Sequence, residues 1–154
     1  MSPLKPYYGH RIRVLHWAAA QSMSATLASM DLTASQGHIL AFIAHSEQPP
    51  CPHDMEEAFQ LSHPTVSGIL SRLEKKGFIR CTPDPADRRC KRVSLDAKGQ
   101  ECLARMDATI AENERRMVEN FTEEEKRQFA DLLDRAIINM GGCSCRPTCK
   151  EESE

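Results

Sequence analysis

The sequence predicts a mainly α-helical protein with one small β-hairpin, and three observations support this fold class. Aromatic residues make up only 5% of the 154 residues, so the core must be built from Leu, Ile, Val, Met and Ala, a composition that suits helices. Several stretches place apolar residues three and four positions apart, which is the period of an amphipathic helix. Two short strand-like segments bracket residues 83–87, whose Pro and Asp content is typical of a turn.

The chain is expected to open with two helices. Residues 7–30 carry apolar side chains at helical spacing and predict a long amphipathic helix. Thr33 and Gln36 have the spacing of a capping box, in which each side chain bonds to the other residue's backbone, and they predict the start of a second helix. The Pro-rich residues 47–52 then break the helical pattern.

Two shorter helices follow this break. Asp54 and Glu57 repeat the capping-box spacing and predict a short helix that ends near Gln60. Ser62 is a favourable N-cap for the next helix, and Gly77 is a natural end because glycine tolerates a left-handed backbone. Two helices joined by a tight turn are therefore expected here.

The hairpin and two long helices complete the chain. Residues 78–82 and 90–95 are the expected strands. Asp96 is a favourable cap for a long helix, and Thr122 with Glu125 forms a further capping box for the last one. Both helices carry an apolar stripe along one side.

These elements predict one domain, residues 1–142, followed by a flexible Cys-containing tail, residues 143–154. The centre, residues 33–95, has the element order of a winged helix-turn-helix, in which a hairpin lies beside the second helix. The long helices at residues 7–30 and 97–140 carry apolar stripes that the small central unit cannot cover. Intertwined helices of two chains would cover them, so we expect a homodimer; the alternative is a monomeric helical bundle.

Positive charge gathers on the winged segment although the whole chain has a net charge of −2. Residues 62–92 hold eight Lys or Arg against three Asp or Glu. A polyanion-binding surface needs such a local excess, so this segment predicts binding to double-stranded DNA. Taken alone, a charged hairpin is more often a solvated surface, but the polar helix beside it favours the DNA interpretation.

Two patterns occur together in this segment. A helix pattern, SxxTVSxxLxRLExxGxI, begins at Ser62 and ends at Ile79, and a wing pattern is formed by Asp87, Arg89 and Leu95. With these patterns and the same helix order, about residues 7–140 resemble the MarR family of bacterial winged helix-turn-helix transcriptional regulators. The resemblance implies a dimeric repressor, a palindromic operator, and release from DNA by a small, often aromatic, effector.

Several positions depart from the family pattern. Glu56 stands where the family usually has a small residue, and Gln60 where it usually has glycine, so the turn is expected to differ in shape. Pro64 lies in the first turn of the recognition helix, where it donates no hydrogen bond to DNA. Asp96 replaces the usual threonine after the wing and caps a helix equally well.

The first DNA contacts are expected from the leading face of the recognition helix, because short polar side chains there suit phosphate oxygens and base edges. These residues are Ser62, His63, Thr65 and Ser67, with His63 and Ser67 as the candidates for base contacts. Arg72, farther along the helix, either contacts phosphate or forms a structural ion pair across the wing.

The wing supplies the second set of expected contacts. By resemblance, Asp87 orients a wing arginine, and the negative potential of a narrow minor groove favours an inserted arginine. Arg88 is nearest the tip, and Arg89 occupies the family position. Lys91 and Arg92 alternate sides of a strand, so only one of them is expected to face DNA, and Lys91 is the candidate.

Two kinds of switch remain open. A small aromatic effector would enter a cleft lined by His16, Trp17, His38 and Met106, although helical spacing equally makes these residues core or interface. The alternative is a metal- or redox-responsive regulator, because Cys143, Cys145 and Cys149 form a close thiol cluster. A tetrahedral zinc site there would lack its fourth ligand.

Other classes of protein find little support. No glycine-rich phosphate loop, nucleophile elbow or helical His pair occurs, so neither an enzyme nor a cofactor is expected. No apolar run approaches the ~20 residues of a membrane span, and the N-terminal segment has no signal core, so we expect a cytoplasmic protein away from membranes. One alternative class remains, a winged helix that binds other proteins instead of DNA. Weak salt dependence of nucleic-acid binding would favour this alternative.

Overall fold

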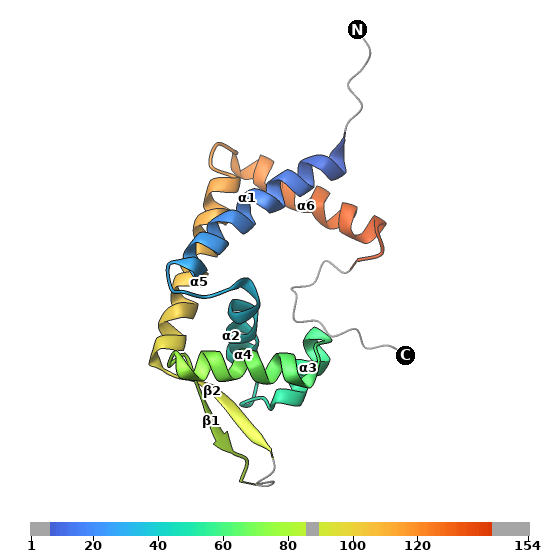
Figure 1. Ribbon diagram of the computed structural model, residues 1–154. Helices are drawn as coiled ribbons and strands as arrows, with labels where there is room; N and C mark the ends of the chain where they lie inside the picture. The colour runs from blue at the N-terminus through green and yellow to red at the C-terminus, as the bar shows by residue number, and fades with distance from the viewer. Residues whose placement is uncertain (1–6, 86–89, 143–154) are drawn as a thin grey trace. The chain divides into compact units, whose positions relative to one another are not determined.

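Six helices and a two-stranded antiparallel sheet form the part of the chain that the computed structural model describes, residues 7–85 and 90–142 (Figure 1). This confirms the predicted fold class. The elements in chain order are α1 (Tyr8–Ala28), α2 (Ala34–His45), α3 (Pro52–Phe59), α4 (His63–Lys75), β1 (Ile79–Pro83), β2 (Lys91–Leu95), α5 (Ala97–Met117) and α6 (Glu123–Asn139). The chain falls into two units, Met1–Asn113 and Glu114–Glu154. Within the described ranges, no helix combines the length and the apolar character needed to cross a membrane.

The first unit has a hydrophobic core to which each of α1 to α5 and both strands contribute. The side chains with no exposed surface are Leu40, Met55, Val66, Leu73 and Val93. Because α4 buries one face in this core, its opposite face is left at the surface of the unit.

The hairpin is tied to the core at its base. β1 and β2 pair antiparallel, from Ile79 opposite Leu95 to Pro83 opposite Lys91. The loop before α3 runs beside β2, where the Val93 amide donates to the Pro50 carbonyl at 2.9 Å. The hairpin therefore has a fixed base next to α3.

The second unit consists of the end of α5 and α6. The predicted capping box of Thr122 and Glu125 is present and starts α6. Phe121 and Phe129 pack edge to face, with ring centroids 5.7 Å apart. Within the single chain α6 has no buried residue. Its large exposed apolar side chains are those of Leu132, Ile137 and Ile138, with Met140 just beyond it.

Most predicted helix boundaries are confirmed and one is wrong. The capping box at Thr33 is present, and Gly77 has φ +78° after the end of α4. α3 begins at Pro52 instead of after Asp54. The Cys51 amide donates to Asp54 Oδ2 at 2.7 Å, so Asp54 is the third residue of the helix and closes its first turn. Proline favours the first helical position, which accounts for the earlier start.

The turn between α3 and α4 keeps a left-handed residue although it contains no glycine. Gln60 has φ 50° and ψ 43°. The Leu61 amide donates to the Glu56 carbonyl at 3.1 Å, as in a Schellman turn. The prediction that the turn differs in shape is therefore wrong. Gln60 adopts the left-handed conformation that a glycine at this position would adopt without strain.

Gln60→Gly is expected to raise the free energy of unfolding by about 1 kcal/mol, because it removes the Cβ that disfavours a left-handed backbone. Urea denaturation followed by circular dichroism measures this change. Gln60→Ala keeps the Cβ and is the matched control, which should unfold near the urea concentration of the parent protein. A glycine variant no more stable than the alanine variant would contradict the proposed strain.

Candidate nucleic-acid interface

The helix α4 is held firmly by its neighbours. Its buried side chains are Val66, Ile69, Leu70 and Leu73. Phe59 at the end of α3 packs edge to face on Phe42 of α2, with ring centroids 5.5 Å apart. Glu74 accepts a hydrogen bond from the Cys81 amide at 3.0 Å and so joins the end of α4 to β1. A rigidly seated helix can present its other face at a constant position.

The predicted leading face of α4 is exposed along its length. Its four residues, all at the surface, are Ser62, His63, Thr65 and Ser67. Ser62 is the N-cap residue as predicted, but its hydroxyl lies 2.9 Å from Thr65 Oγ1 and accepts no backbone N–H of the helix. Two hydroxyls thus lie together at the start of the helix, an arrangement suited to phosphate oxygens or base edges.

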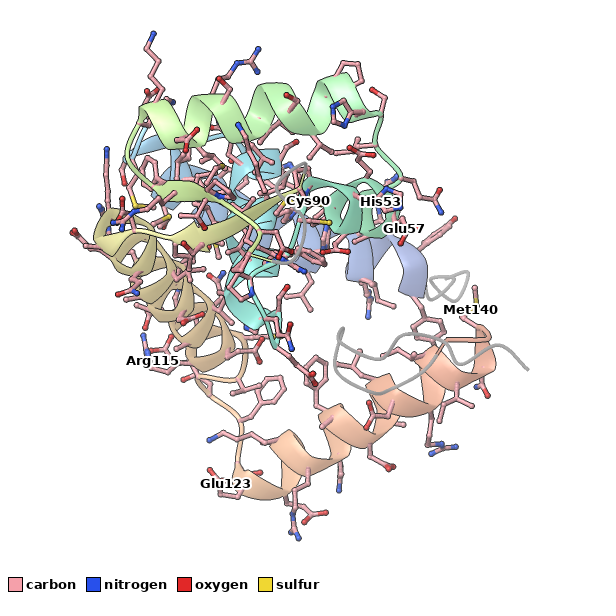
Figure 2. All side chains as sticks on the ribbon, turned by 90° about the horizontal axis from the view of Figure 1, so that it is seen from below. His53, Glu57, Cys90, Arg115, Glu123 and Met140 are labelled. Carbon is pink, nitrogen blue, oxygen red and sulfur yellow. The ribbon has the colours of Figure 1, made fainter. Side chains whose placement is uncertain are left out.

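His63 is held by a residue of the preceding helix. Its Nδ1 lies 2.6 Å from Glu56 Oε1, and this hydrogen bond holds the pKa of Glu56 below its usual value. His53 lies 3.5 Å from Glu56 Oε2 and 3.3 Å from Glu57 Oε1. Figure 2 shows His53 and Glu57 together on α3. The sequence marked Glu56 only as a departure from the family pattern and gave no sign of this cluster, which needs the turn to bring α3 and α4 together.

Half of the described basic residues in this segment already have acidic partners. The ion pairs are Lys76 with Asp31, Arg80 with Asp96, and Arg92 with Asp84. The exposed cations of this segment that form no ion pair with another described residue are Arg72, Lys75 and Lys91. In the described part of this segment, these three cations remain for phosphate groups.

Some of the predicted wing contacts fall outside the described residues, namely Asp87, Arg88 and Arg89. On β2, Lys91 is exposed, whereas the Arg92 guanidinium lies 2.6 Å from Asp84 Oδ2 and donates to the Pro49 carbonyl at 3.2 Å. The alternation expected along the strand is therefore present, with Arg92 used to fix the hairpin.

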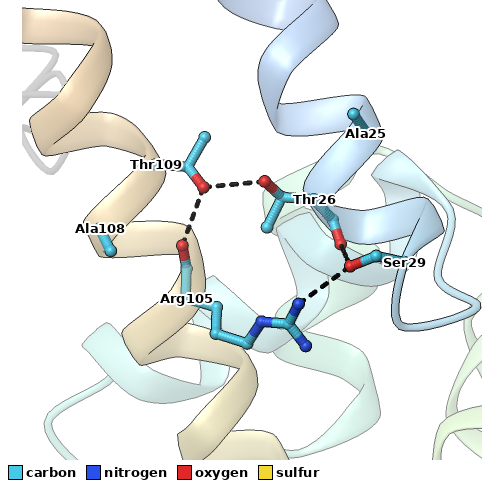
Figure 3. Close-up of a pocket in the computed structure, with 6 residues that line it drawn as sticks. All are labelled: Ala25, Thr26, Ser29, Arg105, Ala108 and Thr109. Atoms are coloured by element: carbon cyan, nitrogen blue, oxygen red, sulfur yellow. Dashed lines mark hydrogen bonds between the residues drawn. The ribbon is translucent and has the colours of Figure 1, made fainter.

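A hollow of about 480 Å³ lies between α1 and α5 of the first unit (Figure 3). Its lining consists of Ala25, Thr26, Ser29, Arg105, Ala108 and Thr109. The hydroxyls of Thr26 and Thr109 lie 2.8 Å apart, and Arg105 donates to Ser29 Oγ at 3.1 Å. A guanidinium and hydroxyls beside small apolar side chains suit a small anionic or phenolic molecule.

The four residues predicted to bind an effector lie elsewhere. His16, Trp17 and His38 are exposed, and Met106 is buried in the core. None of the four lines this hollow or the neighbouring one beside Phe78. Sequence reasoning missed Arg105, because helical spacing reveals the apolar face of a helix and gives no signal for a polar residue that faces another helix.

The described cysteines form no metal site. Among residues 7–85 and 90–142, no group of three or more His, Cys, Asp or Glu side chains is arranged to hold a metal. Burial raises the pKa of the Cys51, Cys81 and Cys102 thiols, which keeps them protonated and unreactive. The cluster of Cys143, Cys145 and Cys149 lies outside the described residues.

Comparison with known sequences gives one consistent family. Residues 32–91 match the model of the MarR family. The HTH-type transcriptional regulator PecS of Dickeya dadantii (strain 3937) is 29% identical over 117 residues, which cover 75% of this chain and 70% of PecS. The homoprotocatechuate degradative operon repressor of Escherichia coli is 30% identical over 107 residues, which cover 70% of this chain and 72% of the repressor.

Solved structures give the same result for the fold. MepR, a transcription regulator of the Staphylococcus aureus multidrug efflux pump MepA, superposes with a TM-score of 0.77 at 28% identity, covering 86% of this chain and 98% of MepR. The complex of S. aureus MepR with DNA superposes with a TM-score of 0.74 at 28% identity, covering 86% of this chain and 99% of that one. The arrangement of helices and hairpin is therefore shared with a protein whose structure is known on DNA.

Proposed function

This chain belongs to the MarR family, and from that membership we propose that it is a homodimeric transcriptional repressor that binds a palindromic DNA operator in the cytoplasm. The observation that carries the proposal is the exposed polar face of α4, accompanied by cations without described acidic partners, Arg72, Lys75 and Lys91. Binding of this kind involves no catalysis and needs no cofactor.

In the proposed complex, α4 enters the major groove and the hairpin lies against the adjacent minor groove. The contacts in the major groove come from Ser62, His63, Thr65 and Ser67. Arg72 contacts phosphate, a role supported by its exposure and by the absence of an ion pair with another described residue. Arg88 and Arg89, oriented by Asp87, together with Lys91 supply the wing contacts.

Uncovered apolar side chains support the proposed dimer. In α1 the large exposed apolar residues are Tyr8, Ile12, Val14, Leu15 and Trp17, preceded by Tyr7. Exposed apolar surface of this extent usually marks a protein interface. We assign dimerisation to residues 7–30 and 97–140 and DNA binding to residues 33–95. Two recognition helices related by a twofold axis would then bind two half-sites, which makes the operator palindromic.

Selection from random duplex DNA tests the proposal. The reduced protein should enrich a near-palindromic site, with half-sites about one helical turn apart. The logarithm of the binding constant for that site should fall linearly with the logarithm of the salt concentration, because phosphate contacts release counterions. Failure to enrich any site, with or without zinc or a mild oxidant, would overturn the proposal.

The proposed effector is a small phenol or aromatic carboxylate bound in the hollow between α1 and α5. Arg105 offers it a positive charge, and Thr26 and Thr109 offer hydroxyls. One relative represses an operon for homoprotocatechuate degradation, so this phenolic acid is the first compound to test. A ligand that prefers one arrangement of α1 against α5 would release DNA by favouring a dimer with the wrong spacing of recognition helices.

Arg105→Gln is expected to raise the effector concentration needed for half-release of the operator about tenfold, because it removes a charged hydrogen-bond donor worth about 1.4 kcal/mol. Fluorescence anisotropy of a labelled operator, titrated with a panel of phenols and aromatic carboxylates, measures this. Operator affinity without effector should not change. Arg116→Gln removes a charge elsewhere on α5 and is the control; equal loss of response in both variants would contradict the assignment.

Removal of residues 143–154 tests the alternative switch, in which the thiol cluster senses metal or oxidant. A chain that ends after Gly142 is expected to fold and bind the operator as the full chain does, because α4 and the buried residues of the described core all lie between Leu27 and Met106. Operator binding is measured for both lengths with and without zinc and a mild oxidant. A response of the full chain that the shortened chain lacks would favour a metal- or redox-responsive regulator.

A further inference from the structure

A short hydrogen bond crosses the turn from α4 to α3. His63 Nδ1 lies 2.6 Å from Glu56 Oε1. An ionised carboxylate only accepts hydrogen bonds, so Nδ1 must carry the proton. Glu56 is ionised over the whole range in which histidine titrates, because the hydrogen bond from His63 lowers its pKa. The contact therefore selects one tautomer of the neutral imidazole.

The other ring nitrogen is left to face outward. The His63 side chain is 73% exposed, and its Nε2 makes no hydrogen bond with a described residue. His63 is the first residue of α4, on the face that carries Ser62, Thr65 and Ser67. We propose that Glu56 is a positioning residue that holds His63 in its Nδ1–H form, so that Nε2 meets DNA as an acceptor when the ring is neutral and as a donor when it is protonated. This inference rests on the proposed DNA-binding function.

The two forms of the ring suit different bases. An Nε2 acceptor pairs with the amino group of adenine or cytosine, whereas an Nε2–H donor pairs with N7 or O6 of guanine, or with phosphate. The base preferred at one position of each half-site therefore differs between the neutral and the protonated ring. Protonation also adds a positive charge at the start of α4, which strengthens phosphate binding.

The groups around His63 and Glu56 are compatible with both the neutral and the protonated ring of His63. Among the described residues, the ionisable group in contact with this pair is His53 on α3, which in turn lies 3.3 Å from Glu57 Oε1. His53 lies between the two glutamates, so two carboxylates face two histidines. On the α4 side the neighbours are the hydroxyls of Ser62 and Thr65, which are bonded to each other and do not titrate in this range. A charged His63 therefore has a compensating carboxylate, and a neutral one keeps its hydrogen bond.

Long-range proton–nitrogen NMR of the full-length protein labelled with nitrogen-15 histidine tests the positioning role. At pH 8.5, His63 should show the Nδ1–H tautomer in the parent protein and in Glu56→Gln, whose amide oxygen still accepts the bond. In Glu56→Ala it should shift toward the Nε2–H form that the histidine side chain favours in water. A parent protein with Nε2–H at His63, or no difference between the two variants, would overturn the assignment.

Selection from random duplexes at pH 5.5 and pH 8 tests the consequence for DNA. The parent protein should change its preferred base at one position of each half-site between the two pH values. Replacing the preferred base at that position by another base should lower the affinity about tenfold. His63→Asn should remove the pH dependence, and Glu56→Ala should alter the preference at pH 8 while Glu56→Gln retains it. His45→Asn, which changes an exposed histidine on α2, is the control that should behave as the parent.

The outcomes separate this inference from the proposed function. A parent protein that enriches an operator with the same bases at both pH values, or a His63→Asn variant that keeps the pH-dependent change, would overturn the role of His63 while leaving the repressor intact. If the parent protein enriches no DNA at all, the proposed function fails and the base preference fails with it. The NMR measurement still decides whether Glu56 sets the tautomer.

Discussion

Gly99→Ala is expected to lower the free energy of unfolding by about 3 kcal/mol, at the upper end of the usual range for overpacking a well-filled core. A Cβ at Gly99 would overlap the Phe78 carbonyl oxygen and lie 3.2 Å from Leu95 Cδ2. The carbonyl is backbone and also accepts a hydrogen bond from the Asp96 amide at 3.0 Å, so it cannot swing away as a side chain would. The start of α5 must instead move off the base of the hairpin.

Urea denaturation measures the loss, and Gly68→Ala is the matched control. Gly68 also lies within a helix, but a Cβ there meets nothing within 4 Å. The control should be more stable than the parent by about 0.5–1 kcal/mol, because alanine favours a helix interior over glycine. If Gly99→Ala unfolded at the same urea concentration as Gly68→Ala, the close approach of α5 to the hairpin would be contradicted.

Local signals explain why much of the fold is predictable. The capping boxes at Thr33 and Thr122 are formed within four residues, and the left-handed Gly77 ends its helix by its own backbone preference. The alternation of Lys91 and Arg92 also follows from strand geometry alone. The close approach at Gly99 carries no such signal, because its contact with Phe78 lies outside its own helix. A glycine one turn into a predicted helix indicates only lower stability.

In the candidate site, too, local spacing predicts some features and misses others. The exposed face of α4 follows from helical periodicity and was predicted residue by residue. The acidic partners of the basic residues were not predicted, because they can lie far away in the sequence: Lys76 pairs with Asp31 across 45 positions. The sequence therefore overstates the positive charge that is left for DNA. The hollow at Arg105 likewise depends on how α1 packs against α5, which no spacing within either helix reveals.

Arg89→Ala is expected to lower affinity for the selected operator about tenfold to a hundredfold, while circular dichroism and the mass of the dimer stay unchanged. The expectation comes from the wing pattern of Asp87, Arg89 and Leu95 together with the chemistry of the minor groove. A guanidinium inserted into a narrow groove lies in a concentrated negative potential, and one specific contact of this kind is worth about 1–3 kcal/mol.

Lys91→Ala is the comparison that separates specific from general binding. Lys91 is exposed on β2 and carries a point charge suited to phosphate, so its loss should weaken operator and random DNA alike and reduce the salt slope by about 1 for each subunit. Arg89→Ala should instead weaken the operator more than random DNA, because the width of the groove depends on base sequence. Equal weakening of both DNAs would make Arg89 a phosphate contact. Unchanged operator binding would contradict the assignment of the wing, and DNA recognition would then rest on α4 alone.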